Sequence, residues 1–204
     1  MIPGTAQILT CPHCHAHKEV MSLMSGNTFG QQLWSDNKSI APMLPRVSFV
    51  QQCPKCKGYY LMSRQEPEFG SETSFDLGEL TYLQTKEAWM SLKDTPDLTE
   101  GERLSILLML VWAYNDEFTR ETTDPAPSEE QTYIHGIIDL LLDIDEIDTL
   151  LKAELLREAG RFDESMQMLD SYLADDEFLE KVEAEIRKQN QASNTWPFLI
   201  SNMF

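Results

Sequence analysis

The sequence predicts an α+β protein with a small β-rich part at the N-terminus and an all-α part after it. Three observations predict this class. All four cysteines lie before residue 57, in two short motifs of the same pattern. From about residue 80 onward, apolar residues recur at the 3.6-residue spacing of helices. The charge is also unevenly distributed, because residues 1–65 contain six Lys and Arg against two Asp and Glu, whereas residues 66–204 contain ten against 32. We therefore expect a metal-binding domain at 1–65, a linker at 66–79, an acidic helical domain at 80–190 and a hydrophobic tail at 191–204.

The cysteines form two pairs, Cys11 with Cys14 and Cys53 with Cys56, and each pair has the pattern Cys-Pro-x-Cys. Such a turn places both sulfurs on one side of a tight loop, and proline after the first cysteine restrains the backbone there. Four thiolates complete the tetrahedral coordination of a structural zinc ion. We predict one structural Zn²⁺ held by all four cysteines, with no coordination position open for catalysis.

Two other roles for the cysteines are less consistent with the sequence. A disulfide framework belongs to secreted proteins, and the N-terminus has no basic start followed by an apolar run. A redox Cys-x-x-Cys pair normally lies at the start of a helix. His13, His15 and His17 alternate with the first pair. One of them replacing a cysteine or binding a second metal is an alternative, but we expect exposed loop side chains that do not touch the metal.

The second cysteine pair is flanked by strand-like residues at 47–50 and 59–61, which predicts a β-hairpin with the metal-binding turn at its tip. We expect Gly58 to let the chain leave this turn in a conformation that other residues resist. These features resemble the zinc-ribbon, rubredoxin-like class over about the first 65 residues. The resemblance implies a closed structural metal site.

The two cysteine pairs are separated by 38 residues, more than a compact ribbon needs. We expect residues 20–52 to form a hairpin and a longer loop. Within this excursion, Phe29 and Trp34 are large apolar residues among turn-forming neighbours. They are expected to complete the core or to dock the ribbon on the helices, and the alternative is an exposed recognition surface.

The periodic part predicts helices at about 80–92, 99–119, 129–142, 148–159, 162–173 and 176–189, with a break at 122–128. Thr99 and Glu102 form a capping-box pattern at the start of the second helix, which is apolar around most of its circumference and is expected to be central. The apolar residues 196–200 are expected to fold back over a core, and a partner-binding peptide is the alternative.

The segment 153–169 resembles a tetratricopeptide repeat. Ala153 and Ser165 occupy the small positions where two helices cross, Gly160 occupies the turn, and Phe162 and Leu169 occupy the large apolar positions. It departs from the repeat at Thr149, Tyr172 and Glu177. The resemblance implies a small helical domain with one clear repeat, although three stacked repeats are usual.

An acidic run extends from the end of one predicted helix to the start of the next, at Asp139, Asp143, Asp145, Glu146 and Asp148. It lacks the glycine and the terminal glutamate of an EF-hand loop. We therefore expect a solvated helix end and an interhelix turn rather than a cation site.

The function expected from these features is a non-enzymatic protein-interaction adaptor in the cytoplasm, with another protein as partner. The combination also resembles bacterial proteins that join a Cys-Pro-x-Cys ribbon to a tetratricopeptide-like tail, a resemblance that implies a fold and no activity. A nucleic-acid-associated ribbon is the alternative, and it would use Lys18, Lys38, Arg46, Lys55, Lys57 and Arg64 with Trp34, Tyr59 and Tyr60. The acidic helices make nucleic acid an unfavourable partner. No motif indicates an enzyme, and the longest apolar stretch, 104–114, is too short to span a membrane.

Overall fold

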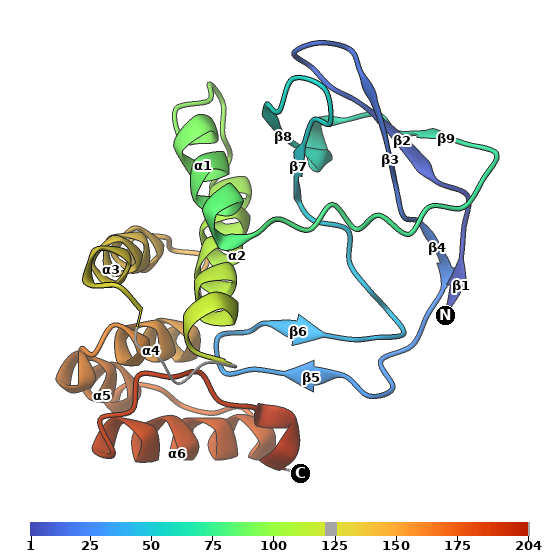
Figure 1. The fold of residues 1–204 in the computed structure, drawn as a ribbon. Coiled ribbons are helices and arrows are strands. Elements are labelled where there is room, and N and C mark those ends of the chain that lie inside the picture. Colours follow the sequence, from blue (N-terminus) through green and yellow to red (C-terminus); the bar gives the residue numbers. More distant parts are fainter. Residues whose placement is uncertain (121–125, 204) are drawn as a thin grey trace. The chain divides into compact units, whose positions relative to one another are not determined.

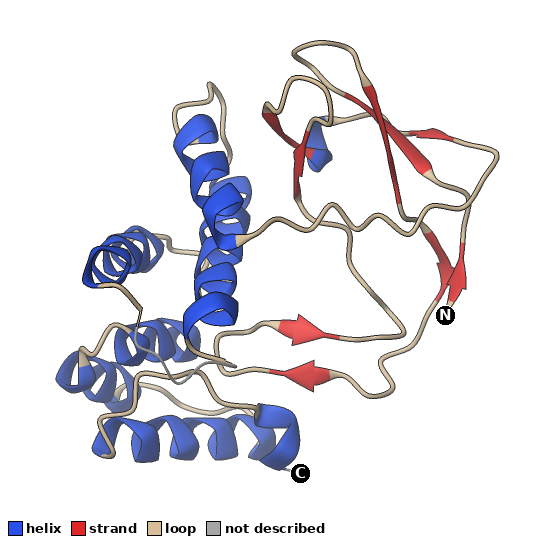
Figure 2. Cartoon of the chain, in the orientation of Figure 1, coloured by secondary structure: helices blue, strands red, loops and turns tan. Residues whose placement is uncertain are grey.

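The structure of the protein is a computed structural model, and it describes residues 1–120 and 126–203. The chain forms two compact units. Unit 1 consists of Met1–Gln31 and Ile40–Ile106, and unit 2 consists of Gln32–Ser39 and Leu107–Phe204. Short strands precede residue 70 and α-helices follow residue 81, so the α+β class is confirmed (Figures 1 and 2).

The strands are short and antiparallel. They are β1 (Ile2–Pro3), β2 (Gln7–Thr10), β3 (His17–Val20), β4 (Leu23–Ser25), β5 (Gln32–Leu33), β6 (Ser39–Ile40), β7 (Val50–Gln52), β8 (Tyr59–Leu61) and β9 (Glu68–Phe69), with the 3₁₀ turn η1 (Met62–Arg64) after β8. β7 pairs with β8, which confirms the hairpin expected around the second cysteine pair. β2 pairs with β3, so the first cysteine pair also lies at the tip of a hairpin.

The helices follow the expected boundaries closely. They are α1 (Tyr82–Leu92), α2 (Glu100–Phe118), α3 (Ser128–Leu142), α4 (Thr149–Glu158), α5 (Phe162–Asp170) and α6 (Glu177–Gln191), followed by the 3₁₀ turn η2 (Ile200–Met203). Most of the break expected at 122–128 lies outside the described residues. At the start of α2, the N–H of Glu102 donates to Oγ1 of Thr99 at 3.2 Å, and the N–H of Thr99 donates to Oε2 of Glu102 at 3.1 Å. The predicted capping box is confirmed. Among the described residues, no helix is long and apolar enough to cross a membrane.

Residues 66–79, which we expected as a linker, are hydrogen-bonded to the rest of unit 1. β9 pairs with β2. Beyond it, the N–H of Met21 donates to the carbonyl of Asp76 at 2.8 Å, and the N–H of Ser48 donates to the carbonyl of Leu77 at 2.7 Å. The segment adds backbone hydrogen bonds rather than a periodic apolar face, so its sequence pattern gave no sign of this pairing.

The helices α4 and α5 pack against each other in unit 2. Gly160 has a φ of 72° in the turn between the two helices, a conformation that glycine adopts without a steric penalty. Ala153 and Ser165 are fully buried, and Oγ of Ser165 donates to the carbonyl of Ala153 at 2.7 Å. The two small residues therefore let the helices approach closely, as expected. The buried core around this crossing consists of Leu150, Ala153, Leu169, Val182, Ile186 and Ile200.

The excursion between the cysteine pairs contributes residues 32–39 to unit 2, where they meet the C-terminal tail. Trp34 forms a backbone bridge with Leu199. The N–H of Ser35 donates to the carbonyl of Phe198, and the N–H of Phe198 donates to Oγ of Ser35, both at 2.9 Å. The tail thus folds back over a core, as expected. Of Phe29 and Trp34, Trp34 packs under the guanidinium of Arg120, which lies 4.9 Å from the centre of its ring, whereas Phe29 is 86% exposed.

Candidate metal centre

The structure brings the four cysteines together in unit 1. Their Sγ atoms all lie within 4.8 Å of one another. Sγ of Cys11 lies 3.7 Å from that of Cys56, and Sγ of Cys14 lies 3.6 Å from that of Cys53. In a tetrahedral site with zinc–sulfur bonds of about 2.3 Å, the sulfurs are about 3.8 Å apart. The four cysteines are free thiols placed to hold one metal ion.

The two cysteine turns have the same backbone geometry. The N–H of His15 donates to the carbonyl of Cys11, and the N–H of Lys57 donates to the carbonyl of Cys53, four residues apart in each case. The fifth residue of each turn has a positive φ, 57° at His15 and 61° at Lys57. The two turns therefore have the same backbone conformation, and each supplies two of the four thiols.

Backbone N–H groups inside the turns face the sulfurs. The N–H of His13 donates to Sγ of Cys11 at 3.4 Å, and the N–H of Cys56 donates to Sγ of Cys53 at 3.5 Å. These donors stabilise thiolates, which are the form that binds metal. Burial opposes the ionisation of Cys53, but the backbone hydrogen bonds from Cys56 and Lys55 prevail and lower its pKa to about 6.

Two of the four cysteines are part of a small hydrophobic core. Cys11 and Cys53 are fully buried, and they pack with Leu9, Val20 and Tyr60. Cys56, in contrast, is exposed. The arrangement fixes one sulfur of each pair in the interior, while the rim of the site lies at the surface.

Gly58 has a different role from the one we expected. The positive φ belongs to Lys57, whereas Gly58 is needed for space, because a Cβ there would lie 2.8 Å from Cδ2 of His13 and 3.5 Å from Sγ of Cys56. The imidazole of His13 crosses from the first turn to the second hairpin, with Nε2 3.1 Å from the carbonyl oxygen of Tyr59. This contact joins the two cysteine turns independently of a metal.

The other histidines lie outside the thiol cluster. His15 and His17 are exposed, and Nδ1 of His17 lies 3.2 Å from Oγ1 of Thr10. Within residues 1–120 and 126–203, the only group of His, Cys, Asp or Glu side chains arranged to hold a metal ion is that of the four cysteines.

Two residues of the acidic run, which extends from the end of α3 to the start of α4, make structural contacts. Asp148 caps α4, with Oδ1 accepting from the N–H of Leu151 at 2.9 Å. Asp139 pairs with Arg161 at 2.7 Å. These contacts agree with the expected helix end and interhelix turn.

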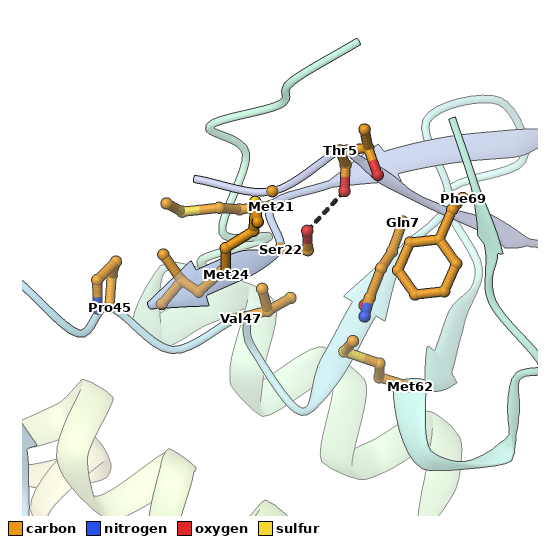
Figure 3. Close-up of a pocket in the computed structure, with 11 residues that line it drawn as sticks. Thr5, Gln7, Met21, Ser22, Met24, Pro45, Val47, Met62 and Phe69 are labelled. Atoms are coloured by element: carbon orange, nitrogen blue, oxygen red, sulfur yellow. Dashed lines mark hydrogen bonds between the residues drawn. The ribbon is translucent and has the colours of Figure 1, made fainter. Parts of the chain in front are cut away.

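A second feature of unit 1 was missed in the sequence. An open groove of about 510 Å³ is lined by Met21, Met24, Val47, Met62 and Phe69, among other residues. Figure 3 shows these side chains around the groove, together with the hydrogen bond of 2.6 Å that Oγ of Ser22 donates to the carbonyl of Thr5. The residues come from separate segments, so no local pattern could have predicted their meeting.

Comparisons of this chain with protein-family models, with curated proteins and with solved structures found no match.

Proposed function

We propose that this chain is a non-enzymatic protein-interaction adaptor, cytoplasmic, in which one structural zinc ion shapes unit 1. The observation that carries the proposal is the convergence of four Sγ atoms at the tips of two equivalent hairpins. Four thiolates suit zinc and fill its tetrahedron, so the ion would supply folding free energy rather than chemistry. A reducing compartment keeps these thiols in the metal-binding form.

The interaction surface is the groove of Figure 3. None of its eleven lining residues has an ionisable side chain. Met24 and Phe69 are 78% and 66% exposed, so large apolar side chains stand in water at its edge. Exposed apolar surface of this kind is typical of interaction sites, and methionine adapts to partners of different shape. We therefore assign the groove to a short apolar segment of a partner protein.

The helices of unit 2 are assigned to a tetratricopeptide-like domain. The support is the α4–α5 crossing, which has small residues at the contact and Gly160 in the turn. In such repeats, paired helices offer surfaces to other proteins.

Nucleic-acid binding has less support as a second candidate. Counted over unit 1 as the structure defines it, the sequence has eight Lys and Arg against eleven Asp and Glu. Three of the expected cations are engaged in ion pairs. Lys18 pairs with Asp76 at 3.6 Å and Arg64 with Glu102 at 2.6 Å in unit 1, and Lys38 pairs with Asp116 in unit 2. The rings of Tyr59 and Tyr60 are buried and therefore not available for stacking on bases.

Metal analysis tests the zinc site. The chain purified without added zinc is expected to contain about one zinc per molecule. Cys53→Ser should lose the metal, and a chelator should abolish the β signal of unit 1 in circular dichroism. His15→Asn is the matched control, because asparagine tolerates the positive φ of that position and the imidazole is not expected to be a ligand. Zinc retained by Cys53→Ser, or lost by His15→Asn, would contradict the ligand set.

Variants of the groove test the interaction. A partner identified with the full chain and then purified should bind at least about tenfold more weakly to Met24→Ser and Phe69→Ser. Phe75→Ser and Met90→Ser are controls, because Phe75 and Met90 are 67% and 52% exposed but do not line the groove. Apolar contacts should make the affinity nearly independent of salt, whereas a steep loss with salt would indicate a polyanion. Equal losses in control and groove variants would reject the groove.

A further inference from the structure

In the interior of unit 2, a group of neighbouring charged side chains contains one more carboxyl group than it has cations. On α4, Arg157 and Glu154 are fully buried and paired, with Nε of Arg157 2.8 Å from Oε2 of Glu154. After α2, the guanidinium of Arg120 is paired with the fully buried carboxylate of Asp36. Each of these two cations therefore has its own buried anion.

Glu158 is a further carboxyl group beside these pairs, one helical turn after Glu154. Its Oε2 accepts a hydrogen bond of 3.0 Å from Nδ2 of Asn115, and the same amide donates to Oδ2 of Asp36 at 2.9 Å. Its Oε1 is buried and has no hydrogen-bond partner among the described residues. Within the described part of the chain, Glu158 also has no salt bridge. A buried acceptor without a hydrogen bond destabilises the folded protein, and a ligand that donates a hydrogen bond to it recovers this free energy.

A cavity of about 270 Å³ lies beside this carboxyl group, and Glu158 is part of its wall. The other walls come from α2, α3 and the segment after α6. They include three aromatic rings, those of Tyr114, Phe118 and Trp196. Trp196 is 45% exposed, so this part of the wall is in contact with solvent. Aromatic faces attract cations, and this attraction grows where water is excluded.

We propose that this cavity binds a small organic cation, an ammonium or guanidinium group, with its charge against Glu158 and its apolar part against Tyr114 and Trp196. The cation supplies the positive charge that this carboxyl group lacks. It also gives Oε1 of Glu158 a hydrogen-bond donor.

The chemistry of the walls selects this class of ligand. Calcium or magnesium would need six or more oxygen ligands, usually with several carboxylates, whereas Glu158 is the one carboxyl group among the described residues that line this cavity. The polar side chains that share the wall with the apolar and aromatic residues are Asn115, Thr119, Gln131, His135 and Thr195. An anion would meet the carboxyl group of Glu158 and be disfavoured. In the absence of a cation, burial raises the pKa of Glu158 well above its usual range, and Asp36 and Glu154 raise it further, which agrees with an acid that lacks a counter-charge.

Titration of the full chain with n-butylammonium tests the proposal, with n-butanol as the neutral molecule of matched size. We expect saturable shifts of unit 2 resonances in NMR, with a Kd on the order of 1 mM or tighter for the cation. The alcohol should bind at least about tenfold more weakly. This result does not depend on the zinc site or on the groove of unit 1.

Variants separate the site from general attraction to an acidic surface. Glu158→Gln keeps an acceptor for Asn115 and should fold, but it should lose cation binding. Glu180→Gln removes an exposed charge from α6 and should bind as the wild type does. Trp196→Leu should weaken binding by about threefold to tenfold, and it provides a test if Glu158→Gln does not fold. The proposal is overturned if cation and alcohol bind equally, if Glu158→Gln or Trp196→Leu binds as tightly as the wild type, or if Glu180→Gln is equally weakened.

Discussion

Glu102 holds Arg64 with both of its carboxylate oxygens, at 2.9 Å from Nε to Oε1 and 2.6 Å from Nη2 to Oε2. The same carboxylate closes the capping box of α2 with Thr99. Nη2 of Arg64 also donates to the carbonyl of Asp97 at 2.8 Å. One acidic side chain therefore connects the end of η1, which follows the second hairpin of unit 1, to the start of α2.

Glu102→Gln should lower the stability of unit 1 at pH 7 by about 1 kcal/mol, as expected for a capping residue in a partly exposed ion pair. The hydrogen bonds from Arg64 lower the pKa of Glu102 to about 2, below its value in the unfolded chain. The stabilisation is thus fully present above about pH 4.3 and is lost as the pH falls toward 2. Denaturant unfolding should show the variant and the wild type converging in acid. Glu66→Gln, at an exposed position, is the control, and a difference that persists at pH 2 would contradict the assignment.

Gly78→Ala should destabilise unit 1 by about 1 to 3 kcal/mol. Gly78 has a φ of 65°, and a Cβ there would lie 2.6 Å from Cδ of Gln51, whose side chain is fully buried. Gly136 provides the opposite case, because it lies in the interior of α3 with open space around the position of a Cβ. Gly136→Ala should stabilise by up to about 1 kcal/mol. Thermal unfolding monitored by circular dichroism checks both, and a stable Gly78→Ala would exclude the close approach.

Asp36→Asn should destabilise unit 2 by about 3 kcal/mol, because it removes the buried anion that is paired with the guanidinium of Arg120. Arg120 is 3% exposed in its side chain and Asp36 is not exposed. Asp116 contacts the same guanidinium, but its side chain is 46% exposed, so Asp116→Asn should cost less than about 1 kcal/mol. Urea unfolding of the two variants measures the contrast. Equal losses of stability in the two variants would show that burial does not determine how much the Asp36–Arg120 pair stabilises unit 2.

Ala153→Leu should destabilise the α4–α5 crossing by about 3 kcal/mol, because Ala153 is fully buried against Ser165 and additional carbons have no space. Ala184 on α6 is exposed, and Ala184→Leu should be tolerated. Thermal midpoints of both variants, with hydrogen exchange to locate the loss in unit 2, check the prediction. A tolerated Ala153→Leu would rule out the close helix approach that the repeat resemblance implies.

Features that depend on neighbouring residues could be predicted from the sequence. The cysteine turns, the hairpin at β7 and β8, the capping box of Thr99 and Glu102 and the helix boundaries all follow from patterns within a few residues. The small residues of the α4–α5 crossing also lie within one short segment. In each case the physical cause is local, since turn geometry, capping and helical spacing act between near neighbours.

Features that depend on distant segments could not be predicted in this way. Asp36 is one of the turn-forming neighbours of Trp34, yet it is the buried anion of Arg120, 84 residues further along the chain. Residues 66–79 looked like a linker, yet β9 is a strand of the sheet that contains β2.

The sequence alone therefore determined which residues can bind a metal, where the helices run and which residues permit their crossing. Only the tertiary structure decided that the four sulfurs meet, that the excursion divides between two units, and that a groove and a cavity form. The reason is that the identity of a side chain does not show which distant part of the chain will cover it and exclude water. This burial makes a turn residue the partner of a buried cation, and it makes a carboxyl group a candidate binding site.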